Sequence, residues 1–241
     1  MGERGADTRE RLVGTALRLF REDGYQATTM RRIAAEAGVS LGNAYYYFAS
    51  KDDLVHELYL AVQREHRELA RPRLRRGASL TENLRVVLHA GIDVMAPYQD
   101  FGSTFLAVAL PPSSRTSPFS ADSTAARQQA IRLMREAVTA SRGCPSGALL
   151  DRLPTLLWLA YLGITLHWVT DSSPGQARTR QLIDGVTPII TRLVGLARLP
   201  VGRRVVTDVG RVMDLVTAPP DPTPPDPPAG KEASEVAGVR Q

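Results

Sequence analysis

Residues typical of helix starts and helix ends recur along this chain. No segment shows the sustained alternation of apolar and polar residues that is typical of a strand. Thr8 predicts the cap of a first helix that ends near Gly24 and carries an apolar stripe at helical spacing. Thr28 or Thr29 predicts the start of a second helix that Gly38 ends. A short third helix is expected from Ser40 to about Tyr47, and a long fourth from Ser50 to about Leu69. The pattern predicts an all-α chain.

The second half of the chain repeats the helical pattern. The periodicity predicts helices near 80–96, 98–110, 121–142, 147–171 and 176–199, with a loop from Pro111 to Pro118 and a turn at Pro174 and Gly175. Pro188 should kink the helix 176–199. A last helix is expected over 205–216. Seven of the residues 218–230 are proline, a composition that cannot pack a core and predicts a disordered tail.

Composition narrows the class of protein. One cysteine, Cys144, excludes an intrachain disulfide and fits a reducing cytoplasm. The longest charge-free run, 153–170, contains Pro154 and His167, which favours a buried or interface helix over a membrane span. We therefore expect a soluble, cytoplasmic protein. The net charge of +5 is only a weak indication that the chain binds a polyanion such as DNA. Residues 1–50 hold seven arginines and six acidic residues. DNA affinity would therefore depend on the placement of side chains.

The segment from Thr28 to Asp53 carries the functional signal. Two short helices joined by a glycine turn form the minimal device for placing one helix in a DNA groove. Gly42 would let the backbone approach the base edges, Asn43 can read adenine through its amide, and Leu41 can touch a thymine methyl.

Phosphate contacts are expected around these base contacts. Hydroxyl groups are typical phosphate ligands, and those predicted here belong to Thr29, Ser40, Tyr45, Tyr46 and Tyr47. A helix cannot bury three adjacent tyrosines on one face, and we expect Tyr47 to be the partly buried one. Lys51 lies at a helix N-terminus, where the dipole disfavours a cation. A bound phosphate would explain that position.

These residues carry a family resemblance. Residues 8–66 contain Leu17-Arg-Leu-Phe20, Gly24-Tyr25, Thr28-Thr-Met-Arg-Arg-Ile-Ala34, Glu36-Ala-Gly-Val-Ser40, Gly42-Asn-Ala-Tyr-Tyr-Tyr-Phe48 and Ser50-Lys51. This stretch resembles the DNA-binding domain of the TetR family of regulators. Leu41 and Ala44 depart from the family pattern, where a polar residue and a larger aliphatic residue are usual. The resemblance implies DNA contacts at Thr29, Ser40, Leu41, Gly42, Asn43, Tyr45, Tyr46, Tyr47 and Lys51.

The resemblance also implies an architecture and a mode of action. Members are homodimers whose last two long helices pair in a four-helix bundle, here about 147–171 and 176–199. Most are repressors that a small ligand releases from palindromic operator DNA. We therefore expect a helix-turn-helix domain at 6–66, with the motif itself at about 29–48. A linker at 67–79, a helical ligand-binding and dimerisation domain at 80–217 and the tail at 218–241 would follow.

The expected ligand is small and apolar or amphipathic, and no cofactor is expected. Aromatic residues at helical spacing in the second domain belong to the core or line a ligand cavity. The candidates for the cavity are Phe101, Phe105, Trp158, Tyr161 and His167.

Other classes of protein compete with a ligand-released repressor. No nucleophile–base, carboxylate-pair, metal or phosphate-loop arrangement appears between 80 and 217, which disfavours an enzyme. The histidines at 56, 66, 89 and 167 form no metal motif, and Cys144 reads as structural rather than redox-sensing. We interpret the arginine-rich stretch 71–76 as a solvated linker rather than a DNA contact. A dimeric regulator that needs no ligand remains the alternative, and activation remains open beside repression.

Overall fold

The computed structural model describes residues 3–111 and 114–197, and every regular element in those ranges is helical. The all-α expectation is therefore confirmed. The predicted helix 205–216, the tail at 218–241 and the last residues of the segment 176–199 lie outside the described residues.

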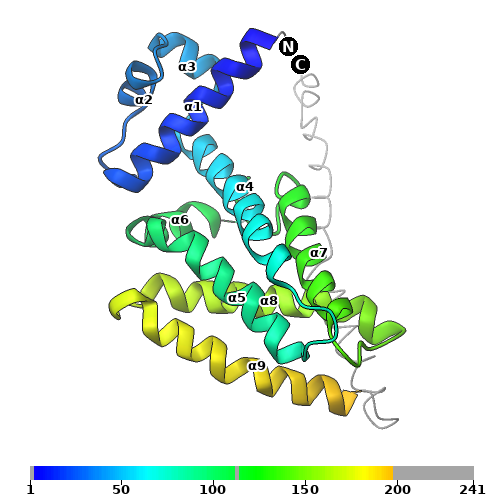
Figure 1. Ribbon diagram of the computed structural model, residues 1–241. Helices are drawn as coiled ribbons and strands as arrows, with labels where there is room; N and C mark the ends of the chain where they lie inside the picture. Colours follow the sequence, from blue (N-terminus) through cyan, green and yellow to red (C-terminus); the bar gives the residue numbers. More distant parts are fainter. Residues whose placement is uncertain (1–2, 112–113, 198–241) are drawn as a thin grey trace, which may run out of the picture.

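The first four helices form the N-terminal part of the molecule. They are α1 (Glu3–Glu22), α2 (Met30–Glu36), α3 (Leu41–Tyr47) and α4 (Lys51–Ala70). Figure 1 shows α1, α2 and α3 gathered at one end, with α4 running from them into a second bundle of helices. The first three helices and the start of α4 share one apolar core, which includes Leu12, Phe20, Ile33, Phe48 and Leu54.

Local chemistry explains where these helices begin. Thr29, Ser40 and Ser50 are the N-caps of α2, α3 and α4, and each side chain accepts a hydrogen bond from the backbone three residues on. Ser50 and Asp53 form a capping box at the start of α4. Helix α1 begins at Glu3, so the predicted cap at Thr8 is wrong. The ion pair between Asp7 and Arg11, one turn apart, supports the extension.

The second bundle consists of α5 (Leu80–Met95), α6 (Gly102–Ala109), α7 (Thr124–Ala140), α8 (Ala148–Thr170) and α9 (Ala177–Ala197). The single helix predicted at 98–110 is instead a 3-10 helix, η2 (Ala96–Phe101), followed by α6. Pro97 lies at the start of η2 and cannot donate a backbone hydrogen bond. Helix α7 begins three residues later than predicted, because serine hydroxyls hold residues 114–123 in turns.

Helix α8 is, by length and composition alone, apolar enough to cross a membrane. Its buried side chains, among them Leu157, Trp158 and Tyr161, belong to the core of the second bundle. The core helix of a globular protein passes the same length and composition test. Both α8 and α9 continue as helices through an internal proline, Pro154 and Pro188 respectively.

The segment expected as a linker at 67–79 is partly helical. Helix α4 runs to Ala70, whose side chain is fully buried in the second core, and a 3-10 helix, η1 (Arg71–Arg73), follows. The backbone of Gly77 then donates to Ala140, the last residue of α7, and the backbone of Arg142 donates to Ala78. Helix α4 therefore packs into both cores, with no flexible joint at its end.

Candidate nucleic-acid interface and internal cavity

Helices α2 and α3 meet through a tight turn. Gly38 has φ +69°, a left-handed conformation that side chains rarely adopt. The backbone of Val39 then donates to the carbonyl of Ala34 at 3.0 Å, which fixes the angle at which α3 leaves the turn. A glycine at position 38 is therefore a geometric requirement of this unit.

One face of α3 anchors the helix and the opposite face is open. Ala44 and Phe48 are 0% and 4% exposed in the N-terminal core. Tyr45 and Tyr46 are 49% and 79% exposed, and Gly42 and Asn43 are exposed as well. Tyr47 is half-buried, as predicted, and its ring meets Tyr46 edge-on at 5.2 Å. Leu41 is half-buried too.

Gly42 has no structural reason to be glycine within the described chain. Its φ is not positive, and a Cβ built there meets nothing within 4 Å. Glycine in a helix costs about 0.5–1 kcal/mol relative to alanine. The penalty is tolerated at a position that faces outward beside Asn43 and Tyr45.

An open groove of about 520 Å³ lies between α2, α3 and the start of α4. The predicted contact residues Thr29, Leu41, Tyr45 and Lys51 line it, whereas Gly42, Asn43 and Tyr46 lie beside it on the exposed part of α3. The structure thus brings the candidate DNA contacts to one surface.

Lys51 is held inside the protein's own fold. Its Nζ donates to the backbone carbonyls of Tyr25 at 2.7 Å and Thr28 at 2.9 Å, and it lies 3.8 Å from the centre of the Tyr25 ring. Burial lowers the pKa of Lys51, and the charge of Asp52 opposes that shift. The turn between α1 and α2 therefore accounts for the cation at this helix start, and a phosphate is not required to explain it.

Sequence reasoning missed Arg31. This side chain is exposed and lines the groove, and no ion pair involves it among the described residues. Its neighbour Arg32 is paired with Asp23 at 3.0 Å and with Glu36 at 3.0 Å. The pair between Arg32 and Glu36 joins residues four apart on α2, whereas the pair with Asp23 depends on how α1 and α2 pack.

A second site lies inside the molecule. A cavity of about 90 Å³ is lined by α4, the end of α5, η2, α6, α8 and Pro118. Of the five predicted lining residues, Phe101, Phe105 and Tyr161 line it. Trp158 is instead packed in the core against Phe119, and the His167 ring lies 3.0 Å from the Thr179 hydroxyl. These two residues do not line the cavity.

Helix α4 supplies lining that the sequence did not indicate. Tyr59 and Gln63 lie one turn apart on α4, and Trp168 faces the cavity from α8. The aromatic spacing had predicted a cavity formed by the second domain alone. In the structure, α4 continues to bury side chains beyond Leu58, and some of these side chains line the cavity.

The cavity adjoins the N-terminal helices of the molecule. Phe101 stacks on Phe20 of α1 at 5.8 Å and packs against Tyr25 at 5.0 Å. The guanidinium of Arg21 lies over the Tyr98 ring at 5.4 Å. Tyr25 in turn holds Lys51 and donates its hydroxyl hydrogen bond to Asp52. A lining residue thus contacts the turn that precedes α2.

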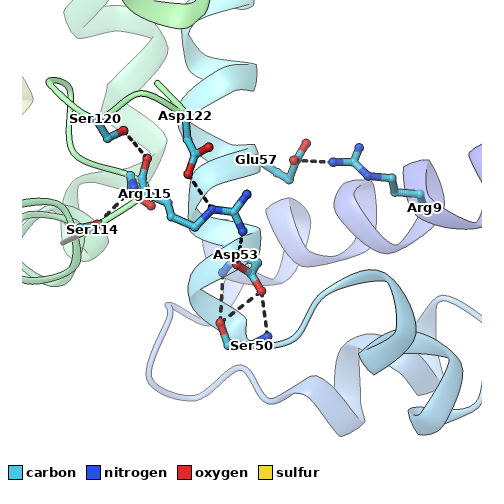
Figure 2. A network of polar contacts seen from close by, with 9 residues as sticks. Arg9, Ser50, Asp53, Glu57, Ser114, Arg115, Ser120 and Asp122 are labelled. Carbon is cyan, nitrogen blue, oxygen red and sulfur yellow. Dashed lines mark hydrogen bonds and ion pairs between the residues drawn. The ribbon is translucent and has the colours of Figure 1, made fainter. Parts of the chain in front are cut away.

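Figure 2 shows a second contact between the two parts. Arg115, from the segment between α6 and α7, pairs with Asp122 at 2.8 Å and with Asp53 at 3.4 Å. Asp53 is also the carboxylate of the α4 capping box with Ser50. Pro118 of the same segment lines the cavity.

Several of the remaining candidate groups have structural partners. His66 Nε2 donates to the Val87 carbonyl at 2.8 Å, and His89 lies 3.2 Å from Asp184. Arg71 pairs with Glu136 and Arg75 with Glu82, at the end of α4 remote from α3 (Figure 1). Within 3–111 and 114–197, no group of three or more histidine, cysteine or acidic side chains is placed to hold a metal ion.

Comparison with known families gives two matches. Residues 12–58 match the model described as bacterial regulatory proteins, tetR family. Residues 83–213 match the model described as tetracyclin repressor-like, C-terminal domain.

Similar curated proteins are transcriptional regulators. The chain is 45% identical over 49 residues to HbdR of Aromatoleum sp. (strain CIB), covering 20% of this chain and 21% of that regulator. It is 46% identical over 50 residues to the repressor KstR2 of Mycobacterium tuberculosis, covering 21% and 25%. It is 38% identical over 81 residues to BetI of Agrobacterium fabrum, covering 34% and 39%. The matches therefore span well under half the length of these relatives, none of which is named as an enzyme.

Solved structures share the fold. A tetR-family regulator from Streptomyces coelicolor aligns with a TM-score of 0.52 at 23% identity, over 90% of this chain and all of that one. The TetR regulator from Nitrosomonas europaea aligns with a TM-score of 0.52 at 20% identity, over 75% and 96%. The arrangement of helices, with the helix-turn-helix at one end, is that of these regulators.

Proposed function

The chain belongs to the TetR family of transcriptional regulators, and from that premise we propose that it is a cytoplasmic repressor that a small molecule releases from a near-palindromic operator. The observation that carries the DNA-binding half of this proposal is the open face of α3. That face exposes Gly42, Asn43 and Tyr45, while Ala44 and Phe48 hold the helix from behind.

Each exposed group has a role against a duplex. Asn43 would read a base through its amide, and a bidentate contact of this kind discriminates by about 1–3 kcal/mol. Thr29, Ser40, Tyr45, Tyr46 and Arg31 would bind phosphates at the edge of the groove. We assign Lys51 a positioning role in addition to any phosphate contact, because two of its three protons already hold the turn before α2.

We propose that two copies pair through α8 and α9. Helix α9 buries Ile183 and Val194 in its own bundle. Its opposite side leaves four large apolar side chains exposed, namely Leu182, Ile189, Leu193 and Leu196. Leu166 of α8 is 47% exposed as well. An apolar surface of this kind marks a protein interface. A dimer would set two copies of α3 roughly 34–36 Å apart, one helical turn of DNA.

We propose that the cavity is the ligand site. Its lining is almost wholly apolar and includes Phe101, which also packs on Phe20 and Tyr25. A ligand that displaces Phe101 or moves α4 would shift the helix-turn-helix relative to its partner. Coupling free energies between such sites are typically about 1–3 kcal/mol. The alternative, a dimeric regulator that needs no ligand, gives the cavity no role.

Footprinting tests the proposal directly. The DNA upstream of the protein's own gene is the first target, because autoregulation would place an operator there. The expected result is a protected, near-palindromic site that loses protection when an effective small molecule is added. A protected site that no member of a broad metabolite library relieves would support the ligand-independent alternative. Absence of any site preferred over random duplex would contradict the DNA-binding proposal itself.

A further inference from the structure

Three polar atoms at the cavity have no hydrogen-bond partner in the part of the chain that the structure describes. They are the hydroxyl of Tyr59, the amide oxygen of Gln63 and the indole nitrogen of Trp168. These residues are 7%, 8% and 3% exposed, so bulk water does not reach them freely. All three line the same cavity. Buried polar atoms are partnered in more than about nine cases in ten. Eight such atoms occur among the described residues, and three of the eight belong to side chains that line this one cavity, so these three call for a common explanation.

The other polar groups of the lining are engaged within the fold. Thr165 donates to the Tyr161 carbonyl at 3.0 Å, and the Tyr161 hydroxyl points to Met95 Sδ at 3.8 Å. The rest of the lining is aliphatic or aromatic. The three side chains with an unpartnered atom are therefore the polar exceptions in an otherwise apolar lining. Together they carry two donors, a hydroxyl and an indole N–H, and one acceptor, an amide oxygen.

Among residues 3–111 and 114–197, no charged side chain lines the cavity. Burial lowers the pKa of His66, whose ring lies 5.3 Å from that of Tyr161, so this imidazole is neutral at neutral pH. The cation that acts on Tyr59 is Arg127, and its guanidinium is bound to the carbonyls of Pro118 and Ser120 and to Thr124. An ionic ligand would bring an uncompensated charge into an apolar site, which is strongly unfavourable.

We propose that the cavity selects a neutral ligand with an apolar body and one polar group that both accepts and donates hydrogen bonds, such as a hydroxyl or a carboxamide. This inference rests on the proposed ligand site and adds its chemistry. The polar group would accept from Tyr59 and Trp168 and donate to Gln63. A cavity of about 150 Å³ accommodates benzene, so the cavity of about 90 Å³ suits a short chain or, with outward movement of the half-buried Phe105, a single ring.

Calorimetric titration of the full chain, without DNA, tests the ligand class with four single-ring probes. Phenol carries the polar group, toluene lacks it, and benzoate and benzylammonium carry charges of either sign. Phenol is expected to bind about tenfold more tightly than toluene, the ratio that hydrogen bonds worth about 1.4 kcal/mol give. Neither charged probe is expected to bind. Equal binding of phenol and toluene, preferred binding of a charged probe, or binding of none would overturn the proposal.

Variants locate the selectivity. Tyr59→Phe and Gln63→Leu are each expected to weaken phenol binding about threefold to tenfold without weakening toluene binding. Thr165→Val is the matched control, since this lining hydroxyl already has a partner, and it should retain the preference for phenol. A preference that survives undiminished in the double variant Y59F/Q63L would place phenol elsewhere and overturn the proposal.

A parallel measurement of operator release separates the two levels of inference. If phenol binds with the expected selectivity and leaves the protein on its operator, the cavity chemistry stands and the release mechanism fails. If a charged probe releases the operator while phenol neither binds nor releases, the release mechanism stands and the ligand class is wrong.

Discussion

At the residue scale, adjacent arginines at the start of α2 have different tasks. Arg32 is engaged by Asp23 and Glu36, whereas Arg31 borders the open groove. Replacing Arg31 with alanine is expected to weaken binding to all duplexes and to reduce the slope of log K against log salt by about 1, as loss of one phosphate contact does.

Arg32→Ala is the control for this prediction. It should leave the salt slope unchanged and lower stability only slightly, because its ion pairs lie on the surface and are screened by solvent. Anisotropy titrations at several salt concentrations measure both slopes. Identical slopes for the wild type and the Arg31 variant would remove Arg31 from the interface.

The residue scale also shows what sequence can and cannot predict. Thr29, Ser40 and Ser50 were recognisable as caps because each bonds a backbone group only three residues away. Lys51 was misread because its partners, Tyr25 and Thr28, lie 26 and 23 residues earlier. A contact across that distance depends on how α1 and α4 cross, which local pattern does not contain.

At the scale of elements, the turn between α8 and α9 depends on one carboxylate. Asp171 is 4% exposed and accepts hydrogen bonds from the hydroxyl and backbone N–H of Ser173 and Thr179, all between 2.6 and 3.0 Å. Burial disfavours the ionised form, but these four bonds outweigh it and hold the pKa of Asp171 below its ordinary value.

This shift predicts a pH dependence. A carboxyl with a lowered folded pKa stabilises the protein fully above its unfolded pKa of about 3.9 and loses that contribution as pH falls below it. Asp171→Asn is therefore expected to lower the free energy of unfolding by about 2–3 kcal/mol at pH 7. The difference from wild type should shrink below about pH 4. Urea titrations at a series of pH values measure it, and a difference that stays constant with pH would contradict the assignment.

The aromatic contact between η2 and α1 is the second element-scale prediction. Phe101→Leu keeps an apolar side chain but removes ring contacts with Phe20 and Tyr25, worth about 0.5–1.5 kcal/mol. Ligand-free operator affinity should change little. The ratio of operator affinities without and with an effective ligand should fall. Phe119→Leu, a change at a ring that packs on Trp158 instead, should leave that ratio unchanged. Equal ratios in both variants would exclude this coupling route.

At the scale of elements, the sequence predicts the helices better than it predicts what their faces contact. The long helices were predicted within a few residues because their apolar spacing is local. The sequence could not show which apolar side chains of α9 belong to the core and which to an interface. Ile183 is buried, whereas the adjacent Leu182 is 39% exposed. The cavity could not be located fully either, since its lining joins α4 to α6 and α8 across as much as 110 residues of chain. Phe101, Phe105 and Tyr161 were identified, whereas Tyr59, Gln63 and Trp168 were not.

At the scale of the whole molecule, dimer formation should govern DNA affinity. Leu193 is 59% exposed on α9, and Leu193→Glu would place a charge in an apolar interface. The variant is expected to sediment as a monomer and to lose most of its operator affinity. Leu110→Glu changes an equally exposed leucine (67%) at the end of α6 and should remain dimeric. Sedimentation velocity checks both, and a dimeric Leu193 variant would place the interface elsewhere.

The most direct test of the central claim, that α3 presents its open face to DNA, is a single exchange at Gly42. Alanine is the better helix former and its Cβ meets nothing within the described chain, so Gly42→Ala should stabilise the fold by about 0.5–1 kcal/mol. Gly14→Ala, at an exposed position in α1 that is equally free of contacts, should stabilise it similarly. Operator affinity, measured by anisotropy, should fall in the Gly42 variant alone. An undiminished affinity in that variant would contradict the claim.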